Sequence, residues 1–274
     1  MSRLPPVRMA MTTALALAIG FGAAACPVTG AATAARTTEI AGTAASAPSF
    51  DPVEFFTDFF TRVGGDPPNR GNLSQRVVAG SPAEAFVDYL FGFATARLDS
   101  RQGPLEPFTV TESLTPVSGE QAVDVCNEGF CDQFSGFVVT DGQLQSFLLN
   151  GVPIEGRLAS ATKALEFGPI SVRVDGAFER VTVDELAVVL SIIPSGEELA
   201  VAWDEVRYAD PAQGDLPVDL PASAYPRVVE PVGAQAVVLQ FPTGTLGGEV
   251  VFSYTTPSSD VPVEVRVTVD ELRP

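Results

Sequence analysis

The 274-residue sequence contains no histidine, the side chain that most often acts as a general base near neutral pH. Every Ser-His-Asp and Cys-His arrangement is excluded with it, and so is the commonest ligand of zinc. The sequence also lacks a P-loop, a GxSxG motif and a GxGxxG turn before a helix. Lys163 is the only lysine, and no S-x-x-K pattern surrounds it. We therefore expect no catalytic residues, no cofactor and no metal, although the 34 acidic residues leave paired carboxylates open.

Long apolar runs are also scarce. Residues 9–21 are strongly apolar, but this run is shorter than the roughly 20 residues that span a bilayer. Arg3 and Arg8 precede the run, and three alanines at 23–25 follow it, which is the pattern of a signal peptide over residues 1–25. We therefore expect an exported protein, either held at the outer face of the cell membrane or secreted.

Cysteine is scarce as well, and each of the three cysteines has an expected role. Cys26 follows the alanines and resembles the lipobox cysteine of bacterial lipoproteins, which implies acylation and membrane attachment by a lipid anchor only. The same small residues fit ordinary secretion, so both alternatives stay open. Cys126 and Cys131 then remain to pair, because residues five apart face each other across a hairpin within reach of a disulfide. Free or redox-active thiols and a metal pair are the alternatives there.

Positive charge is the last scarce feature, with 16 basic against 34 acidic residues. Removing residues 1–25, which hold two arginines and no acid, takes the net charge from −18 to −20. Such a surface repels phosphate backbones, so we expect no nucleic-acid partner. Calcium prefers carboxylate and carbonyl oxygens on a bending backbone, but the D-x-D-x-D-G spacing is absent and calcium binding stays open. Its candidate ligands are Asp204, Glu205, Asp210, Asp215 and Asp219.

A flexible tether and two helices are expected next. Residues 26–49 are rich in Ala, Thr, Ser and Gly and cannot bury a core. Asp51 is the expected N-cap of a Phe-rich helix, whose apolar face packs on the domain or docks on a membrane. Ser81 and Glu84 have capping-box spacing and predict a second helix that runs to about Leu98.

Period-two alternation predicts strands in the rest of the chain. Residues 157–167 form an ambiguous joint, expected as one helical turn, and residues 209–226 form a long proline-rich loop without a strand pattern. Before the joint the expected strands form an antiparallel meander at 107–112, 121–126, 132–140 and 143–149. After the joint they are expected at 170–174, 180–193, 198–208, 227–232, 234–241, 249–254 and 261–269. The pattern leaves open whether 180–193 is one long strand or a strand pair.

Two stretches resemble known folds. Within residues 168–256, Leu186-Ala-Val-Val-Leu-Ser-Ile, Val201-Ala-Trp-Asp-Glu-Val-Arg-Tyr and Val237-Val-Leu-Gln-Phe-Pro resemble the immunoglobulin-like sandwiches of secreted lipoproteins, and the preference for arginine over lysine resembles actinobacterial proteins. Residues 82–150 are similar to NTF2-like and cystatin-like folds, which implies an apolar cavity. We expect an α+β N-terminal domain at 50–160, helices first and the meander after, followed by an all-β immunoglobulin-like sandwich at 161–274.

These observations predict a non-catalytic protein of the cell envelope that acts as a binding or interaction module. Its partner would be an unknown protein or another envelope component. The alternative is a carrier of an apolar small molecule or lipid inside the α+β domain. Phe86, Tyr89 and Phe93 are the expected ligand-binding residues, and a cavity of roughly 300 Å³ or more beside them would favour the carrier.

Overall fold

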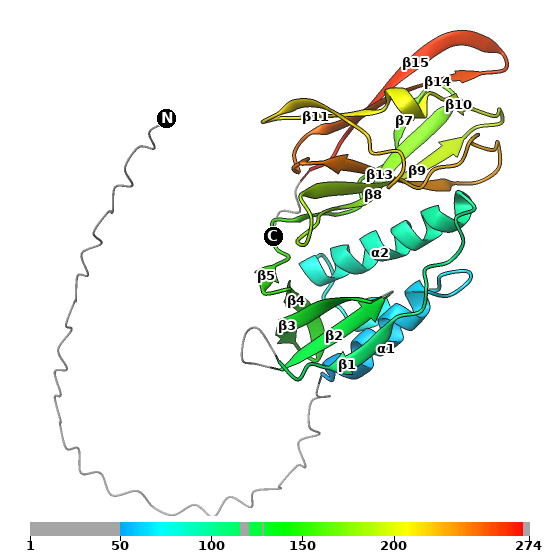
Figure 1. The fold of residues 1–274 in the computed structure, drawn as a ribbon. Helices are drawn as coiled ribbons and strands as arrows, with labels where there is room; N and C mark the ends of the chain where they lie inside the picture. Colours follow the sequence, from blue (N-terminus) through cyan, green and yellow to red (C-terminus); the bar gives the residue numbers. More distant parts are fainter. Residues whose placement is uncertain (1–49, 116–120, 128, 271–274) are drawn as a thin grey trace, which may run out of the picture. The chain divides into compact units, whose positions relative to one another are not determined.

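Residues 50–115, 121–127 and 129–270 are described by the computed structural model, so the expected signal peptide, the tether and Cys26 lie outside the described residues. Within these ranges the protein is mostly β, with antiparallel sheets and two α-helices (Figure 1). No helix in this part of the chain is both long enough and apolar enough to cross a membrane.

Helix α1 (Pro52–Val63) begins where the sequence predicts. The backbone N–H of Glu54 donates to Asp51 Oδ1 at 3.1 Å, which satisfies one of the free N–H groups of the first turn. The Phe-rich face packs inward and does not face solvent, so it is not available to dock on a membrane. Its buried aromatic residues are Phe55, Phe56, Phe59 and Phe60.

Helix α2 (Pro82–Asp99) is also capped as expected. The backbone N–H of Glu84 donates to Ser81 Oγ at 3.2 Å. The Glu84 carboxylate reaches back one residue further than in the usual capping box and accepts from the backbone N–H of Gly80 at 2.7 Å. Local sequence therefore sets the start of the helix that carries much of the candidate site.

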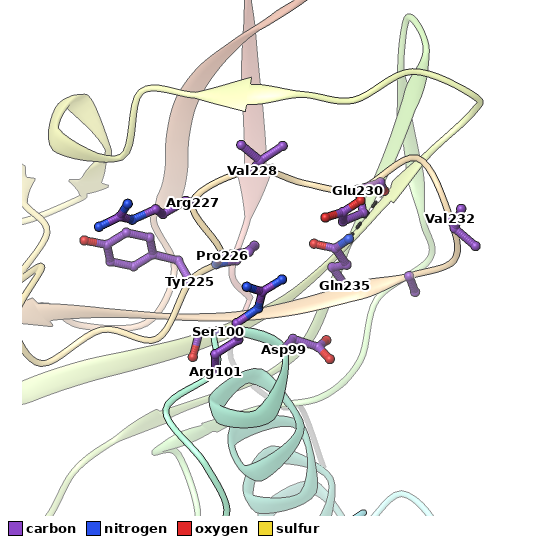
Figure 2. A pocket seen from close by; sticks show the side chains of 11 residues that line it. Asp99, Ser100, Arg101, Tyr225, Pro226, Arg227, Val228, Glu230, Val232 and Gln235 are labelled. Carbon is purple, nitrogen blue, oxygen red and sulfur yellow. Dashed lines mark hydrogen bonds between the residues drawn. The ribbon is translucent and has the colours of Figure 1, made fainter.

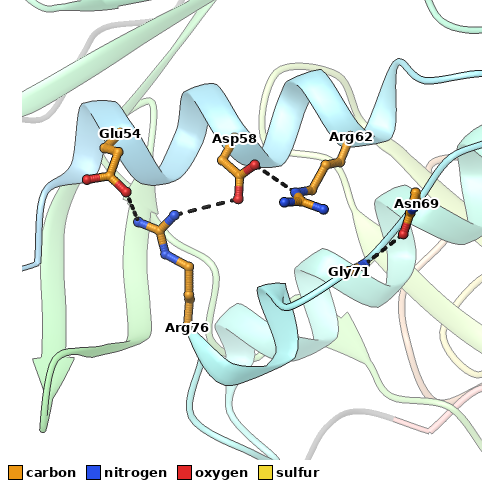
Figure 3. Close-up of polar contacts among 6 residues, drawn as sticks. All are labelled: Glu54, Asp58, Arg62, Asn69, Gly71 and Arg76. Atoms are coloured by element: carbon orange, nitrogen blue, oxygen red, sulfur yellow. Dashed lines mark hydrogen bonds and ion pairs between the residues drawn. The ribbon is translucent and has the colours of Figure 1, made fainter.

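Charged side chains tie α1 to the segment that follows it (Figure 3). Arg76 Nη2 lies 3.3 Å from Glu54 Oε1, and Arg76 Nη1 lies 3.6 Å from Asp58 Oδ2. Arg62 Nε donates to the other oxygen of Asp58 at 2.7 Å. The Arg76 guanidinium also lies 5.3 Å from the centre of the Phe55 ring. Each exposed pair is worth about 0–1 kcal/mol, so this network orients the connection more than it stabilises it.

The first sheet is a meander with the order β1-β2-β3-β4-β5. It confirms the four antiparallel strands expected between residues 107 and 149 and adds a short fifth strand. Asp141 and Asn150 open the two tight turns with positive φ, as the Asp-Gly and Asn-Gly pairs predict. The strands are β1 (Thr109–Glu112), β2 (Ala122–Asn127), β3 (Phe130–Thr140), β4 (Gln143–Leu149) and β5 (Val152–Pro153).

Two further antiparallel sheets are built by the rest of the described chain. The second has the order β13-β9-β8-β6, with β7 paired to β8, and the third has the order β10-β14-β11-β12, with β15 paired to β14. The second sheet contains β6 (Leu158–Ala159), β7 (Leu165–Phe167), β8 (Ile170–Glu179), β9 (Glu185–Pro194) and β13 (Gln235–Pro242). The third contains β10 (Ala200–Val201), β11 (Arg207–Asp210), β12 (Gly214–Pro217), β14 (Glu249–Thr256) and β15 (Ser259–Thr268).

Several local expectations after residue 156 are wrong. The joint at 157–167 contains β6 and β7 in place of a helical turn, because β8 offers both of them a hydrogen-bonding partner. The loop at 209–226 contains β12, which folds back on β11 through Gly214 at φ 84°. Residues 227–232 form no strand and make a single bridge between Leu199 and Val229, because Pro226 and Pro231 remove ladder donors.

The expected strand at 198–208 is interrupted by a 3₁₀ helix, η2 (Trp203–Glu205). The indole of Trp203 lies 5.0 Å from the Tyr225 ring between centroids, so the turn buries a large aromatic side chain that an extended strand would direct elsewhere. The run 180–193 also resolves into a turn and a single strand, since β9 begins at Glu185.

Helix α2 lies between the first and second sheets and packs on β8, β9 and β13 on one side and on β4 on the other (Figure 1). Gly92 permits this close approach, because a Cβ there would lie 2.7 Å from Val189 Cγ1. One face of β9 therefore meets α2 and the other meets the third sheet, which explains why its residues form a continuous apolar run and do not alternate.

Two hydrophobic clusters fill the described chain. One surrounds α1, α2 and the first sheet, and it also takes in Phe178, Val189 and Val238 from the second sheet. The other fills the space between the second and third sheets. The first cluster crosses the boundary expected near residue 160 without a break, so that boundary stays a prediction that unfolding experiments can test.

Candidate functional site

An aromatic-lined pocket of about 250 Å³ opens between α2, the first sheet and the end of β8. The three residues expected to bind a ligand, Phe86, Tyr89 and Phe93, all lie on its wall. The volume falls slightly short of the 300 Å³ named above and suits a small ligand. The rest of the lining is mainly apolar and comprises Phe60, Leu90, Leu105, Phe108, Val125, Asn127, Phe130, Asp132, Phe134, Leu149, Phe178 and Arg180.

The disulfide expected between Cys126 and Cys131 is confirmed and holds the hairpin beside this pocket. The two residues are paired directly across β2 and β3, with their Cα atoms 4.0 Å apart. Pairing continues to Asn127 and Phe130, so the connection is shorter than the four-residue turn expected, with only residues 128 and 129 between paired positions. Residue 128 lies outside the described residues.

The register of this hairpin decides which side chains line the pocket. Successive residues of a strand point to opposite faces, so Val125 and Asn127 share a face with their partners Asp132 and Phe130. That face lines the pocket, and the disulfide lies on the other face. Phe130 is 83% exposed at the rim, an unusual position for a large apolar side chain. The disulfide thus fixes the hairpin without filling the pocket.

Tyr89 is the buried polar side chain of the pocket, with only 4% of its surface exposed. Its hydroxyl has no hydrogen-bond partner among the described residues. Burial raises the pKa of Tyr89 well above its ordinary value, with Arg180 opposing the rise and Glu185 adding to it. The hydroxyl therefore stays protonated near neutral pH and keeps its hydrogen available for donation.

The charged residues of the pocket already have partners. Arg180, directly after β8, donates through Nη1 to Glu185 Oε1 at 3.0 Å. Asp132 accepts from Asn150 Nδ2 at 2.7 Å. The sequence did not single out Arg180, Asp132 or Phe130, because their places depend on strand register and on β8 ending beside α2. The arrangement offers an apolar wall and a Tyr89 hydroxyl that makes no hydrogen bond within the described residues.

A second, larger cavity of about 830 Å³ lies between the end of α2 and the segment 225–235 (Figure 2). Arg101 and Arg227 line it, are exposed, and make no ion pair within the described ranges. Asp99 Oδ2 accepts from the backbone N–H of Ala236 at 2.8 Å. Its charged side chains are of both signs and mostly exposed to solvent. Among the described residues that line it, no buried polar group lacks a hydrogen-bond partner. We therefore regard the smaller apolar pocket as the better ligand site.

Two of the five acidic residues considered for calcium, Asp210 and Asp215, make their contacts in and beside the β11–β12 hairpin. Asp210 accepts from the backbone N–H groups of Ala212 and Gln213 and from both the N–H and the hydroxyl of Thr245. Burial acts to raise the pKa of Asp210, but these donors outweigh it and hold the pKa below its usual value. Asp215 pairs with Arg207 at 3.0 Å. In the part of the chain that the structure describes, no group of three or more His, Cys, Asp or Glu side chains could hold a metal ion.

One carboxylate on α2 titrates in an unusual range. Burial raises the pKa of Asp88 from 3.8 to about 6, with Arg70 opposing the rise and Glu84 and Asp175 adding to it. Since the folded state binds this proton more tightly than the unfolded state, its contribution to stability is full below about pH 3.8 and is lost as the pH rises through 6. Arg70 forms an ion pair with the Asp88 carboxylate.

We expect Asp88→Asn to raise the free energy of unfolding by about 1 kcal/mol more at pH 7.5 than at pH 4. This figure allows for solvent screening of the partly exposed carboxylate. The substitution removes the charge that burial disfavours and keeps the shape. Urea unfolding of both proteins at the two pH values measures the difference. The exposed Asp260→Asn is the matched control and should show no such change. If Asp88→Asn changes the free energy of unfolding by the same amount at both pH values, the raised pKa of Asp88 is contradicted.

Comparisons with known proteins add little to this geometry. No protein-family profile matches the chain, and no curated protein matches it. Among solved structures the chain is similar to a functionally unknown protein from Listeria monocytogenes EGD-e, with 8% identity over 42% of this chain and 85% of that chain and a TM-score of 0.29. A likeness this slight carries no argument about fold or function.

Proposed function

We propose that the chain is a non-catalytic, exported binding protein of the cell envelope that holds an apolar small molecule in the pocket beside Phe86, Tyr89 and Phe93. The observation that carries this proposal is the aromatic-lined opening of about 250 Å³ in a region that is otherwise closely packed. The pairing of Arg180 with Glu185 and of Asp132 with Asn150 supports binding over catalysis, since neither charge is left to act on a substrate.

The finer architecture is part of the same proposal. We infer that α1, α2 and the first sheet form the α+β domain, and that the second and third sheets form an immunoglobulin-like sandwich. The shared cluster between these two sheets supports the sandwich. The Tyr208 hydroxyl also supports it, because it bonds to backbone groups of the 245–248 turn, much as the conserved tyrosine of immunoglobulin-like domains bonds to nearby backbone.

The proposed localisation rests on the sequence alone. We propose that Cys26 is acylated after removal of residues 1–25, and that residues 26–49 tether the folded part to the outer face of the membrane; without acylation the protein is secreted. Mass spectrometry of the protein from its own host tests this directly. An added lipid mass at Cys26 supports the anchor, and an unmodified mature chain found in the medium would favour secretion.

Binding of N-phenyl-1-naphthylamine, an uncharged aromatic probe whose fluorescence rises in apolar surroundings, tests the pocket. We expect saturable binding to the wild-type protein. Phe93→Gln should weaken it about tenfold, because a tenfold loss needs only about 1.4 kcal/mol and the substitution places an amide on the apolar wall. Fluorescence titration measures both affinities.

Phe137→Gln is the matched control, because Phe137 is also a half-buried ring of the same cluster but does not line the pocket. Its affinity for the probe should match that of the wild type. Absence of saturable binding, or equal weakening by both substitutions, would overturn the proposed function.

A further inference from the structure

The hydroxyl of Tyr89 differs from those of the other buried tyrosines of the described chain. Tyr208 donates to the carbonyl oxygen of Thr245 at 2.6 Å, and Tyr254 donates to the carbonyl oxygen of Phe167 at 2.6 Å. Tyr89 is buried to a similar degree, lines the pocket and has no such partner. The Tyr89 oxygen is not one of the fully enclosed polar atoms that lack a partner, so its hydroxyl is accessible and can donate to a ligand in the pocket. The pocket is where an acceptor can reach it.

We propose that the pocket takes an uncharged amphiphile, an apolar chain that carries a carbonyl or ester oxygen which accepts a hydrogen bond from Tyr89. This inference rests on the proposed function, since it names the ligand class of the same pocket. The rings of Phe93 and Phe178 flank Tyr89, with centroids 6.2 and 5.6 Å from its own, so an aliphatic chain next to the hydroxyl is surrounded by apolar surface.

The charges around the pocket explain why the head group is uncharged. Arg180 is the cationic side chain of the lining, and Glu185 already neutralises it. Asp132 adds a negative charge to the wall. A carboxylate head would therefore meet no free positive charge, and it would enter a protein whose net charge is already −18. An ester or carbonyl oxygen accepts the same hydrogen bond without this repulsion.

The size of the pocket limits the chain. At ~30 Å³ for each water molecule, a volume of about 250 Å³ equals about eight waters, which leaves room for roughly eight to ten carbons. A longer chain would leave through the open mouth, where the exposed ring of Phe130 offers it further apolar surface. Short-chain acyl esters therefore fit both the size of the pocket and the Tyr89 hydroxyl.

The experiment compares the binding of three ligands of equal chain length to the full-length protein. Monodecanoylglycerol, decanoate and decane each displace N-phenyl-1-naphthylamine from the wild type, from Tyr89→Phe and from the control Tyr254→Phe. We expect monodecanoylglycerol to bind best to the wild type, and Tyr89→Phe to weaken it about tenfold while leaving decane unchanged. Tyr254→Phe should leave the ranking of the ligands as in the wild type, because its hydroxyl is paired elsewhere.

Infrared spectra of monodecanoylglycerol with a ¹³C-labelled carbonyl give a readout that a purely structural role of Tyr89 would not change. The ester band should shift to lower frequency in the wild-type complex and lose that shift in Tyr89→Phe. If the probe binds but the ester gains nothing over decane, or Tyr89→Phe changes neither affinity nor spectrum, the inference is overturned and the proposed function stands. Tighter binding of decanoate than of monodecanoylglycerol would contradict the inference that the head group of the ligand is uncharged. If the probe itself does not bind, the proposed function is what fails.

Discussion

Replacing Phe56 by alanine is expected to lower the free energy of unfolding by about 3–5 kcal/mol. Phe56 is 0% exposed, and its ring centroid lies 4.5 Å from that of Phe134 and 5.8 Å from that of Phe147. Truncation leaves a ring-sized void between α1 and the first sheet, because the surrounding rings are held by their own neighbours and cannot collapse into it. Urea unfolding followed by circular dichroism measures the loss.

Phe130→Ala is the matched control, since it removes the same ring from a site that is 83% exposed. It should change the free energy of unfolding by less than about 0.5 kcal/mol. Similar losses for the two substitutions would contradict the packing of α1.

The shape of the unfolding curve carries a second result. The ring of Phe86 lies 5.6 Å from that of Phe178 on β8, so the cluster around Phe56 continues into the second sheet. We therefore expect one transition that Phe56→Ala shifts as a whole. Two transitions, with only one of them shifted, would instead support a domain boundary near residue 160.

Local chemistry made the two helices predictable. Asp51 and Ser81 supply cap oxygens, and both helices start where these caps predict. The meander was predictable for a similar reason, because Asp141-Gly142 and Asn150-Gly151 fix tight turns between alternating strands. In each case the signal lies within a few residues of the element that it determines.

The errors lie where partners distant in sequence decide the structure. β6 and β7 are strands because β8 pairs with them, and nothing within 157–167 records that pairing. Trp203 is buried on a 3₁₀ turn where its ring contacts that of Tyr225, a residue 22 positions further along the chain. Period-two patterns cannot report such contacts, so the sequence overestimated the strands at 198–208 and 227–232.

The residues of the candidate site also fall into those that the sequence could predict and those that it could not. Phe86, Tyr89 and Phe93 were predictable, because one helix face carries them. Phe130 and Asp132 were not, since their side depends on the register of β2 and β3. The free hydroxyl of Tyr89 was not predictable either, because the hydrogen bonds of a side chain depend on the assembled fold.

Substituting alanine for Gly248 should cost about 3–5 kcal/mol of unfolding free energy, by overpacking and by loss of buried hydrogen bonds. A Cβ there would lie 2.4 Å from the carbonyl oxygen of Ala209 and 2.7 Å from Tyr208 Cζ. Neither atom can move freely. Ala209 is paired with Glu249 across β11 and β14, and the Tyr208 hydroxyl bonds to Thr245. Urea unfolding of the variant measures the cost.

Two comparisons separate the clash from other causes. Tyr208→Phe removes the hydrogen bonds to Thr245 and Gly248 without adding an atom, and should cost about 1–3 kcal/mol. Gly247→Ala adds a methyl group in open space at φ 94°, so it bears only the backbone strain of about 1–2 kcal/mol. The loss of unfolding free energy caused by Gly248→Ala must exceed both of these losses if the close approach of β11 is what excludes a side chain at Gly248. A cost equal to that of Gly247→Ala would mean that Ala209 and Tyr208 yield to the methyl group, and that this turn is less rigid than its hydrogen bonds indicate.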